Sequence, residues 1–120
     1  MNQCTNSAVG SKRYRLTVHC QGGHSYADFG KENAIETLSK IMYELSHQQI
    51  PTEAKTTYNF GKIEGGTTIN AIASTATLLY EYRSSMQNCL DIMEKQFQEI
   101  VSHYSNVEIE ILGVRPGNGL

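Results

Sequence analysis

The sequence has 120 residues, which suits one domain, since domains usually hold about 100–200 residues. With 39% hydrophobic and 18% charged residues, the chain has enough apolar material for a core and is not of the disordered class. The formal charge of −2 and the isoelectric point of about 6.1 argue against nucleic acid, whose phosphates require many Lys and Arg side chains. No apolar run approaches the roughly 18 residues of a membrane helix. We expect a cytoplasmic protein whose three scattered cysteines are reduced thiols.

Histidines and cysteines are common zinc ligands, but their spacing here does not form a complete site. The histidines are His19, His24, His47 and His103, and no two of them have the spacing of a helical zinc motif or a zinc finger. Cys20 and His24 make one candidate pair, and no second pair completes it. We therefore expect no metal site within this chain.

The first half of the chain predicts a strand, a helix and a second strand. Residues 13–20 alternate apolar and polar side chains, which is the pattern of a half-buried strand. Residues 33–45 carry apolar side chains at steps of three and four, which predicts an amphipathic helix that ends before Pro51. Residues 56–63 are rich in Thr, Tyr, Phe and Ile and predict a strand, followed by a glycine-containing turn at 64–67.

The second half predicts a long strand, a helix and a final strand. Residues 69–83 predict a long strand, with Ala76, Leu78, Tyr80 and Tyr82 on its apolar face, that forms a hairpin with the preceding strand across the glycine pair. Ser84 and Gln87 have the spacing of a capping box, so we expect a helix to follow Ser84 and to continue to about Tyr104. Residues 107–112 alternate again and predict the last strand.

Six elements in the order strand, helix, strand, strand, helix, strand predict an α+β fold. Each strand has one apolar face and each helix one apolar stripe, so the elements pack most economically as a two-layer sandwich. In it, both helices cover one face of a four-stranded antiparallel sheet. Right-handed crossovers give the strand order 4-1-3-2 of a ferredoxin-like fold. We expect residues 1–120 to form a single domain with its core at about 11–115, and the polar segments 1–12 and 113–120 to be linkers of a domain excised from a larger protein.

A ferredoxin-like fold serves many functions, so the fold alone does not choose among them. An RNA-recognition module needs exposed aromatic and basic residues on its central strands. The first strand offers Arg15, Thr17 and His19 on its polar face and no aromatic residue there, which argues against such a module. A small-ligand-binding regulatory module of ferredoxin-like fold is compatible with all these patterns and is the alternative to the interpretation that follows.

A set of short motifs resembles a known family. The set comprises Gly22-Gly23-His24-Ser25, Phe29-Gly30, Asn33-Ala34-Ile35, the segment 61–70 and Tyr82-Arg83. A Gly-His-Ser loop before a helix, a Gly-Gly-Thr-x-x-Asn hairpin and an arginine thirteen residues after that asparagine are specific in combination. Over about residues 10–115 the chain resembles the lid, or dimerisation, domain of the two-zinc aminoacylase and carboxypeptidase metallopeptidases. That family includes peptidase T, carboxypeptidase G, succinyl-diaminopimelate desuccinylase, and the N-carbamoyl amino acid and allantoate amidohydrolases.

The resemblance implies roles for single residues, each of which also has a local structural explanation. It implies that His24 is catalytic and donates a hydrogen bond to the scissile carbonyl oxygen, although a loop histidine is otherwise an ordinary surface residue. It implies that Asn70 and Arg83 bind the substrate, Arg83 by holding a carboxylate with its planar fork. Otherwise Asn70 would bond turn backbone, and Arg83 would be a solvated cation. Gly65 and Gly66 supply backbone conformations that the turn needs.

The resemblance also implies the chemistry and the partners of the whole protein. Two zinc ions, or similar divalent metals, lie in a catalytic domain that this chain lacks, so the fragment alone should be inactive toward the peptide or amide bond of a small amino-acid derivative. Lids of this family pair as a homodimer through an edge strand and a helix. A straight strand would separate Asn70 from Arg83 by roughly 40 Å. Substrates of such enzymes are small, so one pocket can hardly hold both ends of that strand. We therefore expect each lid to serve two active sites, with Arg83 at its own subunit's centre and His24 and Asn70 at the partner's.

Overall fold

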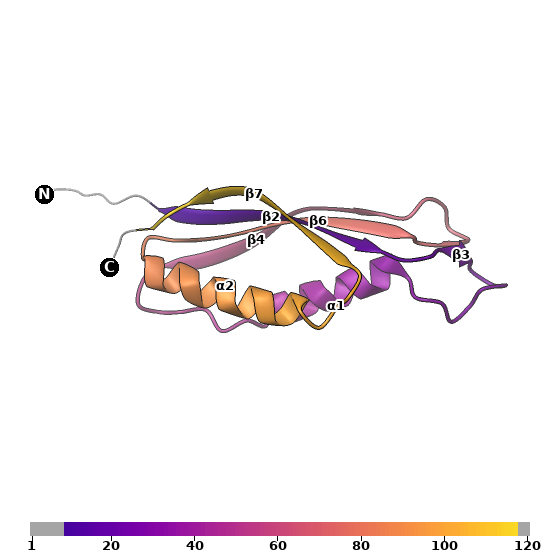
Figure 1. Cartoon of the computed structure of the whole chain (residues 1–120), viewed down its shortest axis with the longest axis horizontal. Helices are drawn as coiled ribbons and strands as arrows, with labels where there is room; N and C mark the ends of the chain where they lie inside the picture. The colour runs from indigo at the N-terminus through magenta and orange to yellow at the C-terminus, as the bar shows by residue number, and fades with distance from the viewer. Residues whose placement is uncertain (1–8, 118–120) are drawn as a thin grey trace, which may run out of the picture.

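The computed structural model describes residues 9–117, and its main body is a four-stranded sheet covered by two helices (Figure 1). In chain order the elements are β2 (Gly10–His19), β3 (Gly23–His24), α1 (Ala34–Ser46), β4 (Thr56–Gly65), β5 (Ala71–Ile72), β6 (Thr75–Ser84), α2 (Gln87–Val101) and β7 (Val107–Arg115). The sheet has the order β4-β6-β2-β7 with every neighbouring pair antiparallel. For the four long strands this is the predicted order 4-1-3-2, so the predicted α+β sandwich is confirmed.

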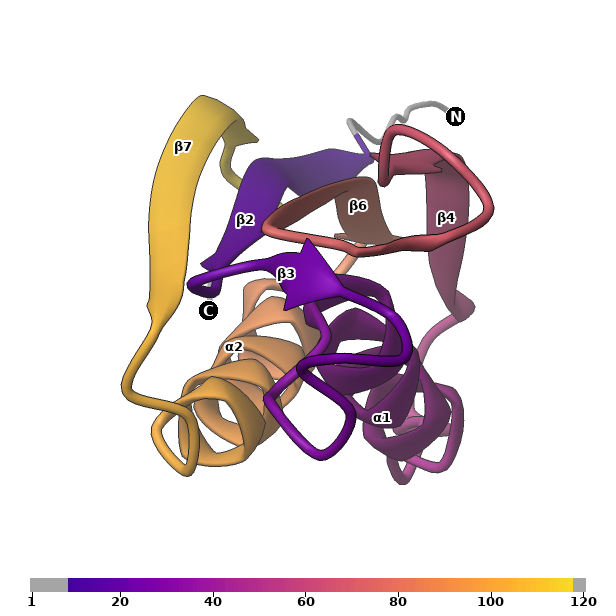
Figure 2. The same cartoon turned by 90° about the vertical axis from the view of Figure 1, so that its right-hand side faces the viewer.

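Both helices lie on one face of the sheet, as the end-on view shows, with α1 on the β4 side and α2 on the β7 side (Figure 2). The side chains that alternate inward from β2 and β6 meet the apolar stripes of the helices and form one core. Its fully buried members include Tyr14, Leu16, Val18, Leu38, Ile41, Leu45, Leu78, Met93 and Phe97. Because burial of each such side chain contributes roughly 1.5–3 kcal/mol, this alternation explains why the sandwich forms.

The two helices begin in different ways. Asn33 caps α1, since its side-chain oxygen accepts hydrogen bonds from two first-turn amides. The capping box predicted for the second helix is wrong, because α2 begins at Gln87 after Met86, which makes no side-chain cap bond. Ser84 is instead the last residue of β6, where its buried hydroxyl accepts hydrogen bonds from the Thr56 hydroxyl and the Met86 amide.

The strand predicted over residues 69–83 is broken in the structure. β5 leaves the main sheet and pairs with β3 in a small second sheet, and β6 begins only at Thr75. Between them, the carbonyl of Ala73 accepts a hydrogen bond from the Ala34 amide (2.9 Å), and the carbonyl of Ser74 accepts one from the Cys20 amide (2.7 Å). These bonds to distant segments divert the chain within the range that was predicted as one strand.

The molecule is elongated, with extents of 65 × 21 × 17 Å. Gly10 and Gly117 pack against each other at one end, while β3 and β5 lie at the opposite end (Figure 1). Residues 10–12 belong to β2 and residues 113–115 to β7, so those parts of the predicted linkers are sheet. The rest of the predicted linkers is mostly at 1–8 and 118–120, outside the described residues. Neither helix of the described chain is long and apolar enough to cross a membrane.

Candidate functional site

His24 lies at the tip of the molecule that is farthest from the contact between Gly10 and Gly117 (Figure 1). Gly22 and Gly23 precede it with φ angles of 82° and 156°, which glycine adopts without the steric cost that other residues incur. The short β3 then pairs His24 with Ala71 of β5. This local geometry leaves the imidazole exposed beyond the end of the main sheet.

Asn70 lies beside His24, as the topology predicted. Its backbone carbonyl accepts a hydrogen bond from the Ser25 amide (3.0 Å). Its side-chain Oδ1 accepts a hydrogen bond from the Thr68 hydroxyl (3.0 Å), which leaves the two N–H groups of the exposed amide as donors. The pair of His24 and Asn70 is held together by the small β3–β5 sheet and not by the main sheet.

Arg83 lies at the other end of β6, opposite Ser11 at the beginning of β2. Thr75 begins β6 at the end nearer the tip, and it is paired with His19. Eight residue steps at about 3.3 Å each separate Arg83 from Thr75 by roughly 26 Å, and His24 lies five residues beyond His19. The structure thus brings two of the three predicted polar site residues together and leaves Arg83 near the ends of the described chain.

The Arg83 guanidinium is already paired within its own strand. Its Nε and Nη2 donate hydrogen bonds of 3.0 Å to the two carboxylate oxygens of Glu81, and these bonds raise the pKa of Arg83 above its ordinary value. Glu81 was not among the predicted site residues, although its position two residues before Arg83 on the same strand face is a signal for such a pair. A hollow of about 360 Å³ opens beside Arg83 and is lined by Val9, Lys55, Thr57, Arg83 and Ser85.

Glycine is needed at positions 65 and 66 for different structural reasons. Gly66 has a φ of 81°, the left-handed conformation expected of a turn glycine. Gly65 still belongs to β4, and a Cβ there would lie 2.9 Å from Cβ of Ala76 and 3.1 Å from Cγ1 of Ile35. Gly65 is therefore required for close packing, while Gly66 is required for backbone conformation.

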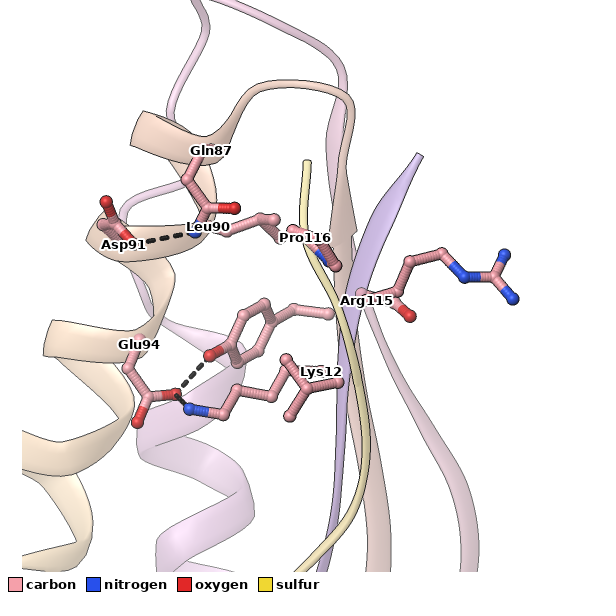
Figure 3. A pocket seen from close by; sticks show the side chains of 10 residues that line it. Lys12, Gln87, Leu90, Asp91, Glu94, Arg115 and Pro116 are labelled. Carbon is pink, nitrogen blue, oxygen red and sulfur yellow. Dashed lines mark hydrogen bonds and ion pairs between the residues drawn. The ribbon is translucent and has the colours of Figure 1, made fainter. Parts of the chain in front are cut away.

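A second hollow, of about 150 Å³, lies between β2, α2 and the chain's last described residues (Figure 3). Lys12 and Glu94 point toward each other in it, with 3.4 Å between Nζ and Oε1. Glu94 also accepts hydrogen bonds from the hydroxyls of Tyr14 and Tyr82. Because these polar groups satisfy one another at the end opposite to His24, we assign them a structural role. The alternation of β2 and β6 places both tyrosines on the apolar face, and it gives no sign of Glu94, their partner on α2.

The chain's ionisable residues do not gather into a metal site within residues 9–117. No group of three or more His, Cys, Asp or Glu side chains there is placed to hold a metal ion. The candidate site is thus a tip with hydrogen-bond donors at one end of the molecule and a cationic hollow at the other.

Comparison with known proteins identifies the family. The model of the peptidase dimerisation domain family matches residues 6–108, and the chain belongs to this family. No curated protein sequence matches the chain significantly. The family match favours a lid or dimerisation domain over the alternative of a ligand-binding regulatory module.

Solved structures share this fold. An amidase of the hydantoinase/carbamoylase family from Burkholderia phymatum superposes with a TM-score of 0.82 at 16% identity, over 93% of this chain and 30% of that one. An aminobenzoyl-glutamate utilization protein from Klebsiella pneumoniae gives a TM-score of 0.77 at 14% identity, over 92% of this chain and 30% of that one. The chain therefore spans less than a third of the length of the structures that it resembles.

Proposed function

We propose that this domain is the dimerisation and substrate-positioning lid of a two-zinc metallohydrolase that cleaves a peptide or amide bond of a small amino-acid derivative. The observation that carries the proposal is the placement of His24 and Asn70 together at one tip, with Arg83 and the ends of the described chain at the other. Contact between Gly10 and Gly117 is the arrangement that a domain inserted into a larger chain needs. The free thiols of Cys20 and Cys89 suit the cytoplasm, where thiols stay reduced.

Each site residue has a chemical role in this proposal. The imidazole of His24 donates a hydrogen bond to the carbonyl oxygen as negative charge develops on it, which stabilises the transition state. The amide of Asn70 donates a second hydrogen bond to the substrate, and Arg83 exchanges Glu81 for the substrate carboxylate. The zinc ions supply Lewis-acid and nucleophile-generating chemistry and belong to a catalytic domain outside this chain.

The proposed two-site arrangement follows from the length of the sheet. A small substrate spans only a few ångströms, whereas about 26 Å of β6 separates Arg83 from the end of the sheet next to His24. The tip around His24 also carries three large, almost fully exposed apolar side chains: Tyr26 (89%), Phe29 (88%) and Ile69 (102%). Such side chains suit a surface that another part of the assembly covers. In this proposal the partner subunit's catalytic domain covers it.

The proposed dimerisation uses an open sheet edge, and the sheet has two, β4 and β7. Unpaired backbone groups of an edge strand favour the addition of a strand from another chain. Both edges carry exposed apolar residues, Ile63 in β4 and Ile111 in β7. Each edge has a helix beside it, α1 and α2 respectively (Figure 2). If two copies pair through the same edge about a two-fold axis, their sheets join and their edge strands run antiparallel. The His24 tip of one lid then lies beside the Arg83 end of its partner.

Activity of the full-length enzyme that contains this domain tests the proposal. With zinc and a panel of N-acyl and N-carbamoyl amino acids and dipeptides, we expect hydrolysis of one class and a loss of about 100- to 1000-fold in kcat for His24→Ala. The matched control is His103→Ala, an exposed histidine after α2, which should keep wild-type kcat. Full activity of His24→Ala, or no hydrolysis of any panel member by the zinc-loaded enzyme, would overturn the proposal.

A further inference from the structure

The two ring nitrogens of His24 have different surroundings. Nδ1 accepts hydrogen bonds from the backbone amides of Tyr26 (3.2 Å) and Ala27 (3.3 Å). An amide N–H can only donate, so Nδ1 is the unprotonated nitrogen of the ring, and the proton of the neutral imidazole is on Nε2. The turn formed by residues 24–27 thus selects one tautomer of His24.

His47 shows the opposite arrangement in the same chain. Its Nδ1 lies 2.8 Å from the backbone carbonyl oxygen of Tyr43. A carbonyl can only accept, so Nδ1 of His47 carries the proton. Since both histidines are exposed, their local backbone contacts and not a difference in burial account for the contrast. His47 therefore serves as an internal reference for His24.

Asp28 closes the loop that holds the ring. Its Oδ2 accepts a hydrogen bond from the His24 amide (2.7 Å), and the Asp28 amide donates back to the His24 carbonyl (2.9 Å). The carboxylate lies directly over Gly23, where a Cβ would be only 2.7 Å from Oδ2. Lys31 lies 3.4 Å from the other carboxylate oxygen. The hydrogen bond from the His24 amide contributes most to lowering the pKa of Asp28 below its ordinary value, and Lys31 contributes next. The carboxylate is therefore ionised at neutral pH.

We propose that Asp28 is a positioning residue that fixes the 24–28 loop, so that His24 is held as the Nε2–H tautomer with its proton directed outward. The inference depends on the proposed function only in its last step, the use of that proton on a carbonyl oxygen. In this arrangement His24 acts as a neutral hydrogen-bond donor, and Nδ1 is occupied by the backbone. Asp28 acts through His24 and makes no contact with substrate itself.

Nitrogen NMR of the 15N-labelled 120-residue chain tests the tautomer without any substrate. At about pH 8.5, above the ordinary histidine range, we expect Nε2 of His24 to resonate as a protonated nitrogen and Nδ1 as an unprotonated one. His47 should show the reverse. An averaged mixture for His24, or a proton on its Nδ1, would overturn the inference. An enzyme that lacks hydrolytic activity would overturn the proposed function and leave this spectrum unchanged.

Variants of Asp28 test the positioning role. Asp28→Ala removes the acceptor, so we expect His24 to become a mixture of tautomers and the Tyr26 and Ala27 amides to exchange with solvent about tenfold faster. Asp28→Asn keeps an acceptor oxygen and should restore both readouts. Lys31→Gln, the matched control, should change neither. An unaltered His24 spectrum in Asp28→Ala, with backbone resonances outside residues 22–31 unmoved, would contradict the role.

Activity provides the second arm of the test. In the full-length enzyme, Asp28→Ala should lower kcat, and adding it to His24→Ala should cause no further loss, since Asp28 acts through His24. A further tenfold loss in the double variant would show that Asp28 acts on another group, which would overturn the assignment.

Discussion

Glu94 is the residue whose replacement should destabilise this domain most clearly. Its carboxylate accepts hydrogen bonds from the hydroxyls of Tyr14 and Tyr82, two side chains that are 1% exposed, and lies 3.4 Å from Lys12. Glu94→Ala removes a charged acceptor from both phenols, and each hydrogen bond to a charged group contributes about 1.5–3 kcal/mol. We expect the free energy of unfolding to fall by about 3–5 kcal/mol, a large fraction of the roughly 5–15 kcal/mol of a typical domain.

Urea unfolding at neutral pH, monitored by circular dichroism, measures this change. Glu94→Gln keeps one acceptor oxygen and should lose about 1–2 kcal/mol. Glu99→Ala, an exposed position on the same helix, should stay within about 0.5 kcal/mol of wild type. A Glu94→Ala variant as stable as Glu99→Ala would refute the reasoning, because the two buried hydroxyls would then not need the carboxylate.

The same carboxylate predicts how stability depends on pH. Burial raises the pKa of Glu94, but hydrogen bonds from Tyr14, Tyr82 and Gln98, with the charge of Lys12, outweigh burial and lower the pKa below its ordinary value. A carboxyl whose pKa is lowered by folding stabilises the protein above its unfolded pKa of about 4.3, and this stabilisation is lost as the pH falls through the folded pKa. The stability difference between wild type and Glu94→Gln should therefore shrink below about pH 4.

Three further results are expected. The 120-residue chain alone should neither retain zinc stoichiometrically after dialysis nor hydrolyse N-acyl or N-carbamoyl amino acids; one tightly bound zinc per chain by elemental analysis would contradict this. Light scattering should show dimers at near-millimolar concentration that either Ile63→Lys or Ile111→Lys abolishes; a strict monomer, or no effect of either variant, would exclude edge pairing. Gly65→Ala should lower stability by about 1–2 kcal/mol through contact with Ala76, whereas Gly113→Ala, whose Cβ would lie 4.0 Å from Cδ of Arg13, should not.

The order of elements was predictable because local patterns and tertiary packing agree along most of the chain. The alternation along β2 and β6 puts Tyr14 and Tyr82 on the buried face, and the apolar stripe of α2 puts Phe97 in the core between the layers. The break before β6 was missed, although the consecutive polar residues Ser74 and Thr75 interrupt the apolar alternation there. Its cause is a pair of bonds to Cys20 and Ala34, which are near in space and distant in sequence.

The site was predictable only at the level of topology. Antiparallel strand order placed the Gly-His-Ser loop and Asn70 at one end and Arg83 at the other, and the structure has that arrangement. Two contacts that orient the site were missed. The His24 amide donates a hydrogen bond to Asp28, and the Arg83 guanidinium donates one to Glu81. The Asp28 contact depends on loop geometry, which hydrophobic periodicity does not encode, whereas the two-residue strand period places Glu81 beside Arg83 without fixing their rotamers.

Mixed dimers of the full-length enzyme test the central claim, that each lid serves two active sites. One subunit carries His24→Ala and the other Arg83→Ala, each nearly inactive alone. In the heterodimer one site would receive both defects and the other none, so activity should recover toward half of wild type. A mixture of His24→Ala with Asn70→Ala is the control and should not recover, since both residues serve the partner's site. No recovery of the first mixture, despite proven subunit exchange, would mean that His24, Asn70 and Arg83 share one site and would contradict the claim.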